Sequence, residues 1–324
     1  MARVRPGATG VWAPLAGGVS CAVWRVDFPH ESLVVKRALA RLTVSDDWRA
    51  PIERALGEYR WFETVRRIDP ALAPEPVAVD AAGGMIAMRW LPSADHTLWK
   101  ARLLAGDADP AFAARVGDAL GRIHAATARR PDLAARFATD EAFFALRLDA
   151  YLLTAGRRNP DVAGALGALS ARTAETRLAL VHGDASPKNI MSGPAGPVFL
   201  DAETAWYGDP AFDAAFCLNH LLLKSLLAPS FAALAESFDA LAAAWLARVD
   251  WEAPAGAGAR AASLLPGLLL ARVDGKSPVD YLTRADQKAF VRAVALPLLE
   301  RSPRTLGQVI AAWRAALARA KPPL

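Results

Sequence analysis

The chain has 324 residues, of which 53% are hydrophobic and 22% are charged, and its net charge is +5. This composition excludes a disordered chain, and the length allows two lobes, each with its own core. Basic residues are scattered without interleaved aromatic residues, so we expect no nucleic-acid partner. Cys21 and Cys217 are far apart and lack neighbours at metal-ligand spacing. We therefore expect a cytoplasmic protein without a membrane span, whose cysteines are small buried apolar residues.

The first third of the chain is typical of β-strands. The stretches CAVWRVDF (21–28) and SLVVKRAL (32–39) are rich in apolar and β-branched residues and flank a short turn, which predicts a hairpin. Before it, LAGGVS places Gly17, Gly18 and Ser20 between two strands. Glycine amides there can approach phosphate oxygens closely, although most such glycine pairs are only turns.

A helix is predicted over 51–68, with Glu58 in its middle, and two strands near 76–79 and 85–88. From Asp109 onward helical patterns dominate. Separate runs of strands and helices predict an α+β fold.

The expected division is a small nucleotide-binding lobe over residues 1–91 and a larger helical lobe over residues 92–324. The segment 252–260, rich in Ala and Gly, is predicted to be a loop between two helices.

Polar residues concentrate in one segment, LALVHGDASPKNIMSGPAGPVFLDAE, which contains His182, Asp184, Lys188, Asn189, Asp201 and Glu203. Residues 177–181 and 197–201 are predicted to pair as strands across turn material. This pairing would bring Asp184, Asn189 and Asp201 to one end of a sheet. Two carboxylates and an amide oxygen suit Mg²⁺, with room left for phosphate oxygens and water.

Lys36 lies on the strand that follows the Gly-containing turn and can hold nucleotide phosphates. Such a lysine needs an anion to fix it, and Glu58 is favoured over Glu53 because it lies inside the following helix. A phosphate cradle, a lysine and two metal ligands, with Glu203 as a spare carboxylate, are what phosphoryl transfer needs.

HGDASPKN, followed by FLDAE and GDPAFD, closely resembles the aminoglycoside phosphotransferase and choline kinase superfamily. The resemblance covers nearly the whole chain, including the segment MRWLP. It implies a two-lobed, protein-kinase-like fold and a kinase that uses ATP and Mg²⁺.

The resemblance also implies a role for each matched residue. Asp184 would be the catalytic base. Asn189 and Asp201 would bind Mg²⁺. Lys36 would contact the α- and β-phosphates of ATP and pair with Glu58.

Other matched residues would bind the nucleotide or hold the loop. The segment that contains Met88, Trp90 and Leu91 would bind adenine through backbone groups. His182 would tie the loop to the strand before the second metal ligand. Glu203 is left open between a further metal ligand and a loop anchor.

Several side chains near this segment have more ordinary interpretations. Asp213 is expected to brace the loop and His124 to pack inside a central helix. His220 is left open between core and pocket. Trp206 and Tyr207 either stack on a ligand or pack the loop.

The segment after Asp201 indicates the kind of acceptor. AETAWYG alone separates it from a helix start at Asp209–Pro210, which leaves no activation segment to hold a protein substrate. Ser186 stands where serine/threonine protein kinases carry a phosphate-contacting lysine, and Lys188 is a candidate replacement.

The expected function is therefore transfer of the γ-phosphate of ATP to a hydroxyl of a small metabolite, a sugar or an amino alcohol. Residues 212–245 are mainly apolar, and 271–282 mix acids and bases, whereas a polycationic aminoglycoside calls for a carboxylate-rich pocket. An aminoglycoside O-phosphotransferase that confers resistance and a catalytically silent nucleotide-binding module are the alternatives.

Overall fold

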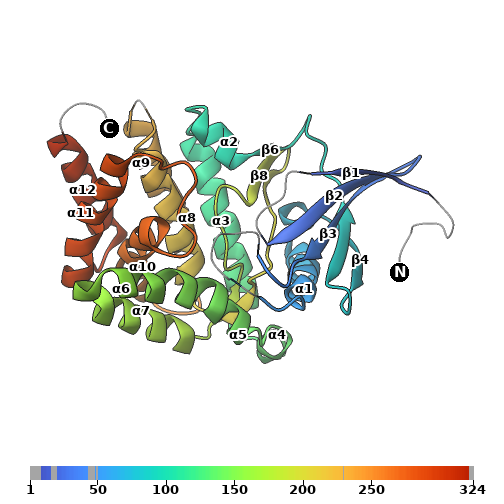
Figure 1. Ribbon diagram of the computed structural model, residues 1–324, viewed down its shortest axis with the longest axis horizontal. Coiled ribbons are helices and arrows are strands. Elements are labelled where there is room, and N and C mark those ends of the chain that lie inside the picture. The colour runs from blue at the N-terminus through green and yellow to red at the C-terminus, as the bar shows by residue number, and fades with distance from the viewer. Residues whose placement is uncertain (1–8, 16–19, 43–47, 49, 229, 321–324) are drawn as a thin grey trace.

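The computed structural model describes residues 9–15, 20–42, 48, 50–228 and 230–320. A β-sheet with one long helix forms one end of the molecule, and a bundle of helices forms the other (Figure 1). The predicted α+β, two-lobed fold is thus confirmed. The division after residue 91 stays a prediction.

The small lobe is built on a five-stranded antiparallel sheet in the order β1-β2-β3-β5-β4. Its strands are β1 (Val11–Pro14), β2 (Cys21–Asp27), β3 (Ser32–Ala38), β4 (Pro76–Asp80) and β5 (Met85–Arg89). The hairpin predicted from the two apolar stretches is β2–β3, with Val23 opposite Lys36. This register places Lys36 in the centre of the sheet, where β5 pairs with β3 on its other side.

Helix α1 (Arg54–Ile68) packs on this sheet and is followed by the short helix η1 (Pro70–Leu72). Trp61, Phe62 and Val65 are fully buried, and their spacing gives the helix one apolar face. The helix begins three residues later than Pro51, where we expected it, because a turn occupies the first residues.

The larger lobe consists of helices that surround α8 (Ala211–Lys224). The other helical segments are α2 (Trp99–Leu104), α3 (Pro110–Thr127), α4 (Pro131–Arg136), α5 (Asp140–Phe143), the π-helical η2 (Phe144–Leu153), α6 (Thr154–Arg158), η3 (Pro160–Val162), α7 (Ala163–Glu175), α9 (Ala232–Leu246), α10 (Pro254–Asp274), α11 (Ala285–Arg301) and α12 (Leu306–Arg319). The predicted loop over 252–260 was wrong, because α10 already begins at Pro254, a residue well suited to a first helical turn.

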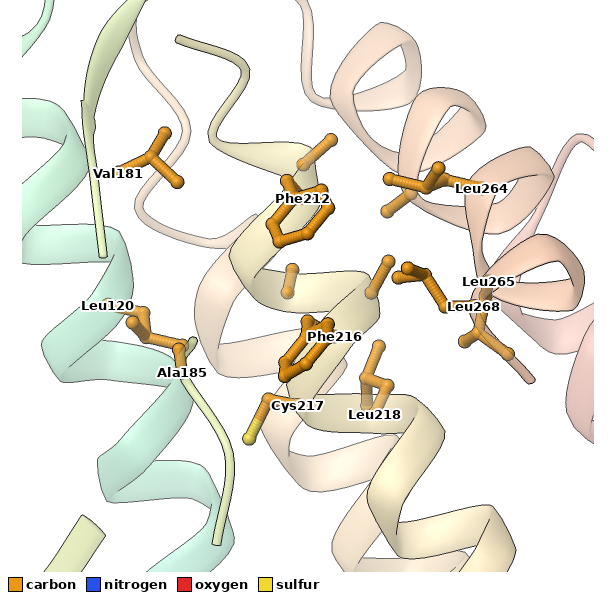
Figure 2. Close-up of a cluster of buried hydrophobic side chains, with 14 of the residues drawn as sticks. Leu120, Val181, Ala185, Phe212, Phe216, Cys217, Leu218, Leu264, Leu265 and Leu268 are labelled. Atoms are coloured by element: carbon orange, nitrogen blue, oxygen red, sulfur yellow. The ribbon is translucent and has the colours of Figure 1, made fainter. Parts of the chain in front are cut away.

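Every residue of α8 is buried, which suits a helix that is apolar on nearly all sides. Figure 2 shows Phe212 and Phe216 of α8 between Leu120 of α3 and Leu264 of α10. Cys217 lies in the same core, as expected of a small buried residue.

Two small sheets carry the polar segment. One consists of β6 (Thr97–Leu98), β8 (Ile190–Gly193) and β9 (Gly196–Phe199), and the other of β7 (Ala179–Val181) and β10 (Trp206–Gly208). The predicted pairing of 177–181 with 197–201 was wrong: β7 pairs with β10, and β9 pairs with β8. Strands of three or four residues offer too few side chains to specify a partner by pattern.

Among the helices described here, none is both long and apolar enough to cross a bilayer.

Candidate active site

The loop after β7 is held by a buried carboxylate from α8. Asp213 accepts hydrogen bonds from the backbone N–H groups of His182 (2.7 Å) and Gly183 (2.9 Å). Its Oδ2 also contacts His124 Nε2 at 3.2 Å, and His124 Nδ1 accepts from the indole of Trp245 at 3.1 Å. These bonds fix the His124 ring with its proton on Nε2. Both the bracing role of Asp213 and the packed role of His124 are confirmed.

Gly183 must be a glycine. Its φ is +78°, and a Cβ at this position would lie 2.4 Å from the carbonyl oxygen of Thr204. The loop therefore passes directly against the segment that follows Asp201.

Asp184 is buried, and two cations hold one of its oxygens. Oδ2 lies 3.1 Å from Arg147 and 3.0 Å from Lys188. Burial opposes its ionisation, but Lys188 and Arg147 outweigh burial and hold the pKa of the Asp184 carboxyl below its usual value. Oδ1 has no hydrogen-bond partner among the described residues, although it is buried. An ionised carboxylate with one free oxygen is suited to accept a proton from a hydroxyl.

The side chain of Asn189 is bonded to this loop, and Leu200, the residue before Asp201, is bonded to Asn189 and His182. Asn189 Nδ2 donates to the Asp184 carbonyl at 3.0 Å, and the Asn189 carbonyl accepts from Leu200 N–H at 2.8 Å. His182 Nε2 contacts the Leu200 carbonyl at 2.9 Å, and its Nδ1 accepts from Asp184 N–H at 3.1 Å. His182 thus ties the loop to the chain beside Asp201, as expected.

Asp201 adopts φ +62°, a left-handed conformation that is unusual for a residue other than glycine. The strand has already ended at Phe199, so strand alternation does not place Glu203 on the same face as Asp201. Such strained residues are concentrated at active sites, where the surrounding structure holds them.

Lys36 joins the two lobes. Its Nζ lies 2.7 Å and 2.8 Å from the two oxygens of Glu58 and 2.5 Å from Asp201 Oδ1. The alternative partner, Glu53, is exposed. Burial alone would lower the pKa of Lys36, but Asp201 and Glu58 raise it well above its usual value. Burial likewise opposes ionisation of Asp201, and Lys36 and Lys188 still hold its pKa below the usual range. Lys36 and Asp201 are therefore charged.

A cleft opens between the lobes at this point. It is lined by the apolar side chains of Leu15, Val23, Val34, Met88, Leu91, Met191 and Leu200, and by the polar residues Ser20, Lys36, Glu58, Asn189 and Asp201. Among the residues expected to bind nucleotide, Gly17 and Gly18 lie outside the described residues. Trp90 also lines the cleft, but its N–H donates to the Ser32 carbonyl at 3.0 Å. Its contribution to adenine binding would therefore come from its carbonyl or its ring.

Glu203 contacts the small lobe. Its Oε2 lies 2.9 Å from Arg54 Nε and 3.5 Å from the thiol of Cys21. Arg54, at the start of α1, also donates to the carbonyls of Ser20 (2.6 Å) and Leu39 (2.9 Å). Glu203 is thus an anchor between the lobes, which favours that interpretation over a metal ligand.

Trp206 and Tyr207 pack inside the protein. The Trp206 ring stacks on Phe143 with centroids 4.1 Å apart. The Tyr207 hydroxyl contacts the carbonyls of Thr127 (3.1 Å) and Leu178 (3.0 Å). These rings pack against the rest of the larger lobe, and neither of them lines the cleft.

Sequence reasoning missed Arg147 and Arg54. Arg147 lies on the π-helical η2, and its Nε donates to the Gly183 carbonyl at 2.6 Å. A π-helical turn is itself common at functional sites, but it has no pattern in the sequence that a 3.6-residue period would reveal. An arginine within an apolar segment is the one signal present.

Comparison with known proteins identifies relatives of this chain. The model of the phosphotransferase enzyme family (APH) matches residues 11–253. Methylthioribose kinases 1 and 2 of Oryza sativa subsp. japonica are each 25% identical over 223 residues, covering 59% of this chain and 51% of theirs. The chain thus spans about half the length of the curated relatives it matches.

Solved structures show the same architecture. An amicoumacin kinase in complex with AMP-PNP, Ca²⁺ and its ligand superposes with a TM-score of 0.57 at 15% identity, covering 94% of this chain and 92% of that one. An ethanolamine kinase of Plasmodium vivax gives 0.56 at 12% identity, covering 91% and 83%. The fold is that of the kinase-like phosphotransferases. The chain belongs to the phosphotransferase enzyme family.

Proposed function

We propose that this protein is an ATP-dependent kinase that transfers the γ-phosphate to a hydroxyl of a small metabolite. The observation that carries the proposal is that Lys36, Asn189 and Asp201 line one interlobe cleft. Asp184 contacts two residues of that cleft, Asn189 and Lys188, and its Oδ1 is buried and unpartnered among the described residues. Relatives that are methylthioribose kinases support a sugar as acceptor, and the neighbour bound to AMP-PNP supports ATP as donor.

In the proposed reaction the acceptor hydroxyl lies at Asp184 Oδ1. The acceptor oxygen forms a bond to the γ-phosphorus, its proton passes to Asp184, and the bond from the γ-phosphorus to the β–γ bridging oxygen breaks to leave ADP. Arg147 and Lys188 hold Oδ2, so Asp184 keeps a fixed orientation during the transfer.

The donor side is served by Lys36 and by oxygen ligands. Glu58 fixes Lys36. Lys36 is placed to contact phosphate oxygens when Asp201 binds a different cation in its place. Asn189 commits its amide nitrogen to the Asp184 carbonyl, which leaves Oδ1 to act as a ligand beside Asp201. These hard oxygen donors fit Mg²⁺, which supplies charge neutralisation of the phosphates when bound.

The test is release of ADP from Mg²⁺–ATP with a panel of sugars, amino alcohols and aminoglycosides. For the acceptor that gives turnover, Asp184→Asn should lower kcat by about 10²- to 10⁴-fold, because it removes the base. The Kd for ATP, measured separately by calorimetry, should stay within about threefold, because the phosphate contacts remain.

The matched control is Asp239→Asn, which makes the same change at an exposed position of α9 and should leave turnover unaltered. Unchanged turnover in Asp184→Asn would remove the base from the proposal. Binding of ATP without transfer to any acceptor would instead support the silent nucleotide-binding module.

A further inference from the structure

Basic side chains gather on the helical-lobe side of the catalytic loop. We call the set the cationic cluster, and it consists of Lys100 of α2, Arg147 of η2, Lys188 of the loop, Lys224 of α8 and Arg272 of α10. These five cations come from five separate parts of the chain, and the carboxylates Asp184, Asp201 and Asp280 act on them.

These carboxylates are already paired, Asp201 with Lys36 outside the cluster. Asp184 contacts Arg147 and Lys188, and Asp280 Oδ2 lies 2.7 Å from Lys100 Nζ. The cluster therefore keeps a surplus of positive charge.

Lys224 and Arg272 make up that surplus. Neither contacts a carboxylate within the described ranges. Lys224 is 2% exposed, and its Nζ lies 4.0 Å from the centre of the Tyr281 ring. Arg272 is 7% exposed, and it donates to the Tyr151 hydroxyl at 2.9 Å and to the carbonyl of Ser277. Its Nε is buried without a partner among the described residues. A buried cation without an anion is costly, so a site that keeps two of them suits an anionic ligand.

Neutral polar groups stand among these cations. His220 Nδ1 lies 2.9 Å from the Tyr281 hydroxyl, and His220 Nε2 is buried without a partner among the described residues. Burial, together with Lys224 and Arg272, lowers the pKa of His220 well below its usual value, so the ring is neutral. It is available for a hydrogen bond to a polar ligand.

The cluster adjoins the proposed base. Arg147 contacts Asp184, and its Cζ lies 5.5 Å from the centre of the Tyr151 ring. The Tyr151 hydroxyl in turn contacts Arg272. From the other side, Lys100 N–H donates to the Pro187 carbonyl of the catalytic loop at 2.7 Å. Arg147 and Tyr151 therefore connect the proposed base to Arg272.

We infer that the acceptor is a small hydroxylated anion, a sugar acid or a sugar phosphate, whose carboxylate or phosphate is bound by Lys224 and Arg272. This inference rests on the proposed function and specifies its substrate class. Burial, with Lys100 and Arg272 nearby, lowers the pKa of Lys224 to about 7, and a bound anion reverses that shift. A cationic acceptor would meet repulsion from the same groups.

The first experiment compares acceptors that share a carbon skeleton and differ in charge. The sets are glycerol, glycerate and glycerol 3-phosphate, then ribose, ribonate and ribose 5-phosphate, with methylthioribose as a neutral sugar. Phosphoryl transfer from Mg²⁺–ATP should be at least about tenfold more efficient, as kcat/KM, for an anionic member than for its neutral counterpart. The carboxylate and phosphate members distinguish the two kinds of anion. A neutral member used best would overturn the inference.

Lys224→Met tests the residue, with Lys276→Met as the matched control, because Lys276 is paired with Asp149 at 3.7 Å. The KM for the anionic acceptor should rise about tenfold to a hundredfold in Lys224→Met, while the KM for ATP stays within about twofold. The control should match the wild type. An unchanged KM in Lys224→Met would overturn the inference.

A binding measurement separates this inference from the proposed function. The thermal midpoint is recorded with each panel compound in the absence of ATP. Anionic members should raise it in the wild type and in Lys276→Met, but not in Lys224→Met. Binding that depends on Lys224, without phosphoryl transfer, would support the anion site and contradict the proposed kinase function. Phosphoryl transfer to a neutral sugar, without binding that depends on Lys224, would support the kinase function and contradict the anion site.

Discussion

At the scale of single residues, Glu203 shows how burial separates two roles that look alike in sequence. A carboxylate two positions after Asp201 is equally suited to a metal or to a basic side chain. In the fold it meets Arg54, whose side chain is 1% exposed, and the pair joins the segment after Asp201 to the start of α1. Removing one partner of a buried ion pair leaves an uncompensated charge. This lowers stability more than replacing both partners with apolar residues would.

Glu203→Gln should therefore lower the free energy of unfolding by about 3 kcal/mol, because Arg54 loses its counter-ion. The Mg²⁺ concentration for half-maximal activity should stay within about threefold, because Glu203 is not a ligand. Urea unfolding and a Mg²⁺ titration of turnover measure the two quantities. Glu53→Gln, at an exposed position, is the control and should change neither. If the Mg²⁺ concentration for half-maximal activity rose strongly while stability stayed unchanged, Glu203 would be a metal ligand and not an anchor.

At the scale of elements, α3 and α9 pack closely because α3 carries a glycine at the contact. A Cβ on Gly117 would lie 2.2 Å from the backbone carbonyl oxygen of Leu241 in α9. Backbone cannot move aside as a flexible side chain can, so the two helices would have to separate.

Gly117→Ala should lower the free energy of unfolding by about 1–3 kcal/mol through overpacking. The matched change, Gly167→Ala in α7, meets no atom within 4 Å and should raise it by about 0.5–1 kcal/mol, as expected for alanine in a helix. Urea unfolding of both variants checks the pair. Equal effects of the same sign would show that the α3–α9 contact does not depend on the glycine.

Elements also show what the sequence can and cannot specify. The β2–β3 hairpin and α1 follow from local patterns of seven to fifteen residues, which repeat often enough to define a face. The pairing of β7 could not be predicted, because its partner β10 has three residues and no alternation. The polar residues around Asp184 could be recognised as one group because they are close in sequence. Arg147 and Lys224 were not, because only the tertiary fold brings η2 and α8 to the loop.

At the scale of the whole molecule, buried histidines make stability depend on pH. Burial lowers the pKa of His182, and burial with neighbouring cations lowers that of His220. A group whose pKa is lower in the folded state than in the unfolded chain binds a proton more weakly in the folded protein, so protonation favours unfolding. The free energy of unfolding therefore falls as the pH drops below about 6.5, the value of an unperturbed histidine. Glu58, whose pKa burial raises to about 7, acts in the opposite direction.

Because these contributions overlap, a difference between variants isolates one of them. Between pH 7.5 and 5.5, His220→Gln should lose about 1.4 kcal/mol less unfolding free energy than the wild type. His30→Gln, at an exposed position, should lose as much as the wild type. Urea unfolding at the two pH values measures the losses. Equal losses in all three proteins would show that His220 takes up its proton as easily in the fold as in the unfolded chain.

The helix α8 carries Asp213 in its first turn and Lys224 at its last residue, about 16 Å apart along one axis. One end holds the amides of the catalytic loop, and the other belongs to the cationic cluster. A rotation of this buried rod to suit a new acceptor would carry the loop and its base out of position. In the proposed kinase, a change of acceptor preference therefore requires the exchange of single side chains around a stationary α8, which leaves the loop and its base where they are.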